Sequence, residues 1–221
     1  MANAGIHRLA VVPALLILLV SSSAGAQARR GHHLHDGFYF RGSIGVGRLV
    51  FDQESDLEGI PNGRVSGPST ASDLMLGGTP VRGLAVGGAL LANHAPDPDF
   101  DGNRLTLEND VAASWVVIGP FVDFFFAPKK GFHLGAAAGP SAIWYRDLDP
   151  GPNDEREAYA GFGVAGWVGY DAWISANWSL GGYLRAMAAW TTRQVDYSGS
   201  PLVDERANGS NLAVLFTALY H

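Results

Sequence analysis

Alternation of apolar and polar residues runs through most of the chain after Gly37. Successive side chains of an extended strand point to opposite faces, so a period of two indicates strands with one apolar and one mixed face. Polar, Gly-rich or Pro-containing segments separate these stretches. The pattern predicts eight strands, at 38–51, 71–79, 84–95, 110–127, 132–146, 159–174, 178–192 and 211–221.

The connections between these predicted strands are alternately long and short. Membrane barrels have such connections, with long loops outside the cell and tight turns in the periplasm. An even number of strands returns the chain to the side on which it started, so a periplasmic N-terminus puts all long loops outside. The long connections are 52–70, 96–109, 147–158 and 193–210, and the turns are 80–83, 128–131 and 175–177.

The two faces of the predicted strands differ in polarity. Even positions from Ala112 to Phe126 are nearly all apolar, whereas Asp123 lies on the other face. A secreted β-sandwich would also alternate, but its outward face should be polar. The sequence therefore predicts an all-β fold, an eight-stranded antiparallel up-and-down transmembrane β-barrel, with apolar residues toward lipid.

The N-terminal residues predict export. Residues 1–26 combine Arg8, an apolar stretch at 9–20 and small residues up to Ala26, which are the three regions of a secretory signal peptide. The apolar stretch is too short for a membrane helix, which needs about 20 residues. We expect cleavage near Ala26, then a solvated His-rich periplasmic linker at 27–36 and the barrel at 37–221.

These features resemble small bacterial outer-membrane barrels of the OmpA transmembrane-domain and OmpX kind. The resemblance covers Gly37–His221 and rests on the eight strands, the loop alternation and the aromatic Tyr220 near the last residue. It implies a place in the bacterial outer membrane and contacts with outer-membrane lipid and lipopolysaccharide. It also implies that Leu212–Tyr220 carries the signal read by the barrel-assembly machinery.

Composition excludes some functions. The net charge of −6 argues against a nucleic-acid partner, because phosphate backbones require a basic patch. The absence of cysteine excludes disulfides and thiolate chemistry.

Five ionisable residues fall on the predicted inner face. An isolated charge is costly in a low-dielectric interior, so these groups should pair with one another. We predict an ion-pair network that fills the lumen; a proton path or narrow passive channel is the alternative. The residues are Arg41, Asp123, His133, Asp171 and Arg185.

The second long connection matches the calcium-loop pattern D-x-[DN]-x-[DN]-G-x₅-E. Carboxylates at its first, third and fifth positions can converge on a hard cation, a backbone carbonyl adds a ligand at the seventh, and a glutamate can close the site. The flanks read as strands, so an EF-hand proper is not expected, and an acidic surface loop is the alternative. The candidate ligands are Asp97, Asp99, Asp101, Asn103 and Glu108.

His94 is the only histidine near the outer end of a predicted strand, and it bears on possible enzyme activity. Some small outer-membrane barrels hydrolyse lipopolysaccharide with a His, a Ser and an acid, but no Ser lies within two residues of His94. We therefore predict a non-enzymatic outer-membrane barrel whose acidic extracellular loops serve a structural or surface-interaction role. A lipopolysaccharide-modifying hydrolase is the alternative.

Overall fold

The computed structural model describes residues 35, 37–55, 62–100, 103–104, 111–127, 129–147, 158–195 and 203–221. The predicted signal peptide and most of the predicted linker lie outside these residues. Among the described residues, no helix is long and apolar enough to cross a membrane.

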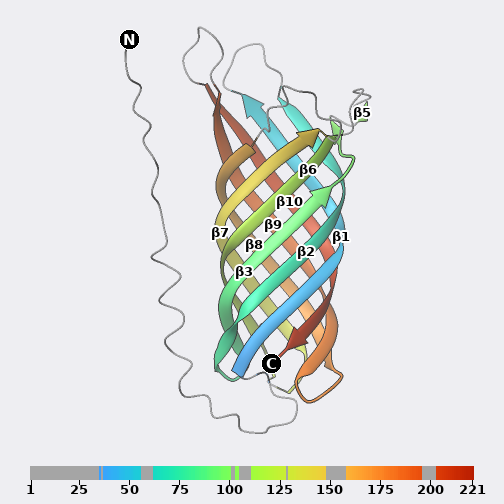
Figure 1. The fold of residues 1–221 in the computed structure, drawn as a ribbon, viewed down its shortest axis with the longest axis vertical. Helices are drawn as coiled ribbons and strands as arrows, with labels where there is room; N and C mark the ends of the chain where they lie inside the picture. Colours follow the sequence, from blue (N-terminus) through green and yellow to red (C-terminus); the bar gives the residue numbers. More distant parts are fainter. Residues whose placement is uncertain are drawn as a thin grey trace, which may run out of the picture. The chain divides into compact units, whose positions relative to one another are not determined.

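Eight long strands form one closed antiparallel sheet (Figure 1). The first strand pairs with the second on one side and with the last on the other, so the long strands leave no open edge. A short hairpin of β4 and β5 extends from the upper end of β2. The strands are β1 Gly37–Ser55, β2 Gly63–Val81, β3 Leu84–Ala95, β4 Asp99–Phe100, β5 Asn103–Arg104, β6 Val111–Phe125, β7 Phe132–Asp147, β8 Ala158–Trp173, β9 Trp178–Val195 and β10 Val203–Tyr220.

The register sets the tilt of the strands. Following paired residues once around the barrel from Arg48 returns to β1 at Phe38, ten positions lower (48 − 38 = 10). Closed barrels with such an offset have strands tilted by roughly 40°. Eight strands at this tilt enclose a space just wide enough to be filled by side chains.

The predicted fold is confirmed, but two strands begin eight residues earlier than expected (71 − 63 = 8 and 211 − 203 = 8). β2 begins at Gly63 instead of residue 71, and β10 begins at Val203 instead of residue 211. The prediction ended each strand where apolar alternation ended. Beyond the apolar band both faces carry polar residues, such as the paired Asp52 and Arg64, while the backbone ladder continues without an apolar face.

The predicted division between the faces is also confirmed. Ile44, Val46 and Val214 point outward and are 67%, 68% and 62% exposed. Intervening positions such as Leu49 and Leu215 are buried in the lumen. A soluble β-sandwich has a polar outer surface, whereas the outer surface of this barrel is apolar and is suited to contact with the hydrocarbon core of a membrane.

Candidate functional site

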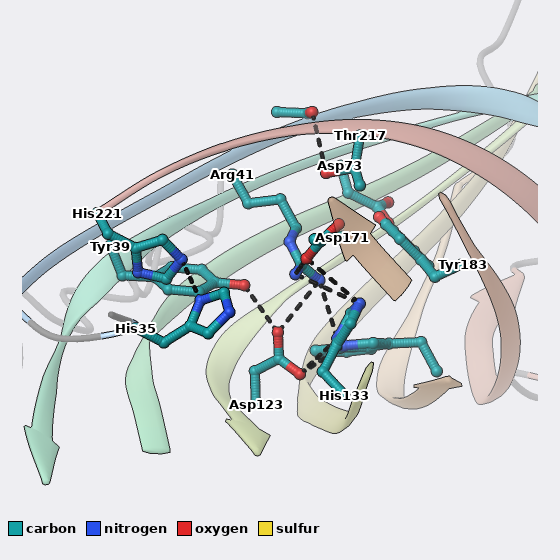
Figure 2. Close-up of polar contacts among 12 residues, drawn as sticks. His35, Tyr39, Arg41, Asp73, Asp123, His133, Asp171, Tyr183, Thr217 and His221 are labelled. Atoms are coloured by element: carbon teal, nitrogen blue, oxygen red, sulfur yellow. Dashed lines mark hydrogen bonds and ion pairs between the residues drawn. The ribbon is translucent and has the colours of Figure 1, made fainter. Parts of the chain in front are cut away.

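Four of the five predicted lumen residues meet near the end of the barrel that carries the short turns, in what we call the Arg41 cluster (Figure 2). Arg41 of β1 donates from Nη2 to Asp171 Oδ2 at 2.7 Å, and its Nη1 lies 3.1 Å from Asp123 Oδ2. His133 of β7 lies between the two carboxylates, with Nδ1 2.9 Å from Asp123 Oδ1 and Nε2 3.5 Å from Asp171 Oδ2. All four side chains are fully buried.

Further donors surround Asp123. Tyr39 donates its hydroxyl to Oδ2 at 2.8 Å, and Trp167 donates Nε1 to Oδ1 at 3.2 Å. The Arg41 guanidinium also lies 5.6 Å from the centroid of the Tyr39 ring and 5.5 Å from that of Tyr183. A buried carboxylate requires such donors and a nearby cation, because a buried carboxylate without partners would strongly destabilise the fold.

Two inward-facing glycines make room for the cluster. A Cβ on Gly135 would lie 2.3 Å from the Trp167 ring, and one on Gly169 would lie 2.5 Å from His133 Nε2. Real Cβ atoms do not approach other atoms this closely, so larger residues would displace the rings that contact Asp123 and Asp171.

Arg185 lies apart from the other four, in a second group that we call the Arg185 cluster. It forms an ion pair with Asp73 of β2, and its Nη2 donates to Asn93 Oδ1 at 2.5 Å and Asn211 Oδ1 at 3.3 Å. Tyr183 donates its hydroxyl to the other oxygen of Asp73 at 2.5 Å. The single predicted network is therefore two networks, because the tilt of the strands separates Arg185 from the other charges.

Asp73 is a lumen residue that the sequence analysis missed. It lies on the same face as Ala71 and Met75, both buried, so its parity within the strand was the available signal. Because Ser72 beside it is also polar, the sequence around Asp73 shows no clear alternation that would assign Asp73 to the lumen.

Two histidines, His35 and His221, lie next to each other and to Tyr39, beside the Arg41 cluster (Figure 2). Nδ1 of His35 and Nε2 of His221 are 2.6 Å apart. The His35 ring stacks on Phe125 with 3.6 Å between centroids. His35 is fully buried, so the expectation of a solvated linker is wrong at this position. The linker prediction considered composition alone, and composition does not reveal that His35 is buried against Phe125 and His221.

Both histidines lie outside the membrane-spanning strands, one before β1 and one after β10. Burial lowers the pKa of His35 to about 2, with the neighbouring His221 adding to the effect. Burial also lowers the pKa of His221 to about 3, and the charge of Arg41 acts in the same direction. Both imidazoles are therefore neutral in the folded protein at physiological pH.

Apolar and aromatic side chains lie in the lumen toward the end that carries the long connections. Trp115 is fully buried and donates Nε1 to Ser141 Oγ at 2.8 Å. Phe51 packs against Trp115 with 6.0 Å between ring centroids. Above them, Arg193 pairs with Glu205 at 2.6 Å. Buried and paired side chains thus line the lumen from the Arg41 cluster to the Arg193–Glu205 pair.

The candidate calcium loop is only partly described. Asp97 is exposed, and Asp99 lies in β4; Asp101 and Glu108 fall outside the described residues, as does the side chain of Asn103. The register pairs positions 99 and 104, and 100 and 103, which leaves Asp-Gly between two paired positions. Asp-Gly is a preferred two-residue hairpin connection, so the motif has an explanation without metal. Among the described residues, no group of three or more His, Asp or Glu side chains could hold a metal ion.

His94 does have a serine partner, contributed by another strand. Ser114 of β6 is its register partner, and Nδ1 of His94 lies 3.0 Å from Ser114 Oγ. His94 is exposed on the outer face, as its parity predicted. The search for a nearby serine in the sequence missed this pair because it is formed across strands. Among the described residues, no carboxylate contacts His94, so an acid that would orient the imidazole for catalysis is not found there.

No protein-family model matches the sequence, and no curated protein matches it. Among solved structures, the outer membrane protein OprG from Pseudomonas aeruginosa is similar at a TM-score of 0.51 and 14% identity, over 87% of this chain and 99% of that one. The outer membrane protein AlkL gives 0.49 and 13%, over 86% and 92%. Neisserial surface protein A gives 0.43 and 12%, over 83% and 96%. The chain therefore has the fold of small outer-membrane β-barrels.

Proposed function

We propose that this protein is a non-enzymatic barrel of the bacterial outer membrane with a filled lumen, which serves a structural or surface-interaction role. The observation that carries the proposal is the burial of two interior arginines, Arg41 and Arg185, together with their carboxylate partners. These partners are Asp123, Asp171 and Asp73. Ions cannot pass between groups that are already paired and packed without breaking those pairs.

The lipid-facing surface supports the location. Large apolar side chains point outward along every long strand, and aromatic residues such as Phe126 and Trp178 stand at the lower ends, where they are 57% and 41% exposed. Aromatic girdles at the interfaces and an apolar band between them are typical of outer-membrane barrels.

Conductance in a planar bilayer tests the filled lumen. We expect the wild-type protein, refolded and heat-modifiable on a gel, to insert without current steps. A porin inserted under the same conditions is the positive control, which shows that the assay detects an open lumen. Replacing Arg41, Asp123 and Asp171 by serine should not by itself produce current, because the Arg185 cluster and the packed Phe51 and Trp115 rings still fill the lumen above. Current steps in the wild type would contradict the proposal and support the narrow channel.

Calcium binding by the second long connection stays a proposal, carried by the sequence pattern alone. Its test is thermal unfolding of the refolded protein with calcium or chelator, for the wild type and Asp101→Ala. A ligand at a hundredfold excess over its Kd stabilises by about 2.7 kcal/mol. If the unfolding temperature of the wild type does not change with calcium, the proposed calcium site is wrong, whereas the proposed barrel is unaffected.

The hydrolase alternative now has one observation in its favour, the contact between His94 and Ser114. It predicts fatty-acid release from lipopolysaccharide that disappears in Ser114→Ala. We expect no release from the wild type, because a His–Ser pair without an orienting acid is a poor nucleophile.

A further inference from the structure

The outer face carries an unusual cation at the upper boundary of its apolar band. Arg48 lies ten positions above Phe38 on the same strand. With a rise of about 3.3 Å per residue and a tilt of roughly 40°, the two are separated by about 25 Å along the barrel axis. The apolar band of such barrels is also about 25 Å tall. Since Phe38 stands among the aromatic residues of the lower boundary, Arg48 stands at the upper one.

Arg48 points outward, in line with Ile44 and Val46 below it. Its guanidinium donates from Nη2 to Ser66 Oγ at 3.1 Å. Among the described residues, no carboxylate forms an ion pair with it, whereas Arg64, farther from the apolar band, lies 2.6 Å from Asp52. Arg48 is thus a cation beside lipid-facing apolar residues with a neutral partner.

Other polar side chains continue from Arg48 around one side of the barrel. Thr70 on β2 is the register partner of His94 on β3, which in turn is the partner of Ser114 on β6. Thr70 donates to the His94 carbonyl oxygen at 3.3 Å. Counting positions along the tilted strands puts all three within about 5 Å of the height of Arg48. We call Arg48, Thr70, His94 and Ser114 the polar arc.

The opposite side of the barrel differs at the same height. Phe162 on β8 and Trp190 on β9 are register partners, and they are 51% and 57% exposed. Aromatic rings of this kind anchor a barrel in the interface without recognising a headgroup. The polar arc instead presents a guanidinium, hydroxyls and an imidazole, which are donors for anions and for sugar hydroxyls.

We propose that the polar arc binds the phosphate group of a glycolipid in the outer leaflet, with Arg48 as its main contact. The proposal rests on the proposed location in the outer membrane. A guanidinium can donate two parallel hydrogen bonds to phosphate, and at the edge of a low-dielectric band the pair is less screened than in water. The His94–Ser114 pair keeps one donor free beside the same headgroup, and the Thr70 hydroxyl, which already donates to the His94 carbonyl oxygen, can accept from a sugar hydroxyl.

The test measures binding of fluorescently labelled lipopolysaccharide to the refolded, heat-modifiable protein in detergent. Loss of a hydrogen-bonded charge costs roughly tenfold in affinity or more, so we expect Arg48→Gln to weaken binding by about that factor. Arg82→Gln is the matched control, because Arg82 is an exposed arginine in the turn between β2 and β3 at the other end of the barrel. The same glycolipid with its phosphates removed should bind the wild type and Arg48→Gln equally weakly.

Equal affinity of Arg48→Gln and wild type, or no preference of the wild type for the phosphorylated lipid, would overturn the inference. Competition by inorganic phosphate at the same concentration as the glycolipid would also overturn it, because the site would then take a free anion. Insertion into lipid vesicles is measured separately. A protein that inserts but shows no phosphate preference contradicts only this inference, whereas one that does not insert contradicts the proposed location.

Discussion

The Arg41 and Arg185 clusters neutralise one buried arginine each, but in different ways. Arg41 is held by two carboxylates, Asp123 and Asp171, with His133 between them. Arg185 is held by one carboxylate, Asp73, and by neutral side-chain amides. The Arg41 cluster thus contains more ionisable groups than the Arg185 cluster. Removing one charged group from the Arg41 cluster should therefore lower the free energy of unfolding of the protein more.

The largest effect is expected from Arg41→Met. It leaves two buried carboxylates without their cation, and breaking a buried pair from one side costs about 3–5 kcal/mol. Urea-induced unfolding in lipid vesicles, followed by gel mobility, measures the change. Arg82→Met in the exposed turn is the control and should unfold like the wild type. A loss below about 1 kcal/mol would mean that the carboxylates are protonated at little cost.

Arg185→Met should cost less, about 3 kcal/mol, because it leaves only one carboxylate and Tyr183 still donates to it. The matched double variant Asp73→Leu/Arg185→Met should recover most of this loss, since replacing a whole buried pair by apolar residues is often neutral. If the double variant is as unstable as the sum of the two single variants, the pair does not act as a unit.

Acid should destabilise the region beside the Arg41 cluster. His35 and His221 have folded pKa values of about 2 and 3. An unfolded imidazole has a pKa near 6.5, so below that pH the unfolded state takes up protons that the folded state does not. Stability is unaffected above pH 7 and should fall by about 2 kcal/mol for each imidazole at pH 5.

Unfolding midpoints between pH 8 and pH 5 measure this effect. His35→Phe keeps an aromatic ring to stack on Phe125 and should lose about half of the pH dependence. A wild-type midpoint that does not change over this range would show that the two imidazoles are accessible to protons in the folded state.

The smallest effect is expected from Gly169→Ala. Its methyl group would lie 2.5 Å from His133 Nε2 and from Tyr183 Cβ, and 2.8 Å from the Gly182 carbonyl oxygen. Since the last two atoms move only with the backbone, we expect about 2 kcal/mol of destabilisation. Gly88→Ala on the outer face is the control, since a Cβ there has nothing within 4 Å. If Gly169→Ala and Gly88→Ala destabilise the protein equally, the loss of stability comes from the backbone and not from the Arg41 cluster.

The alternation of apolar and polar residues determined the fold class, the strand number and which residues face the lumen. Ile44 and Leu215 were assigned to opposite faces correctly, because pleating fixes side-chain direction from sequence position alone. Alternation determined the strand ends less well where both faces are polar, as at Gly63 and Val203.

Only the tertiary structure decided which charges meet. Asp123 and His133 lie ten residues apart, but Arg185 and Asp73 are separated by 112. The tilt of the strands, and not their order, brings such residues to one level. The same holds for His35 and His221, and for His94 and Ser114, which pair across strands. Parity along one strand gives the face of a residue, whereas its height and its neighbour depend on the register of the closed sheet.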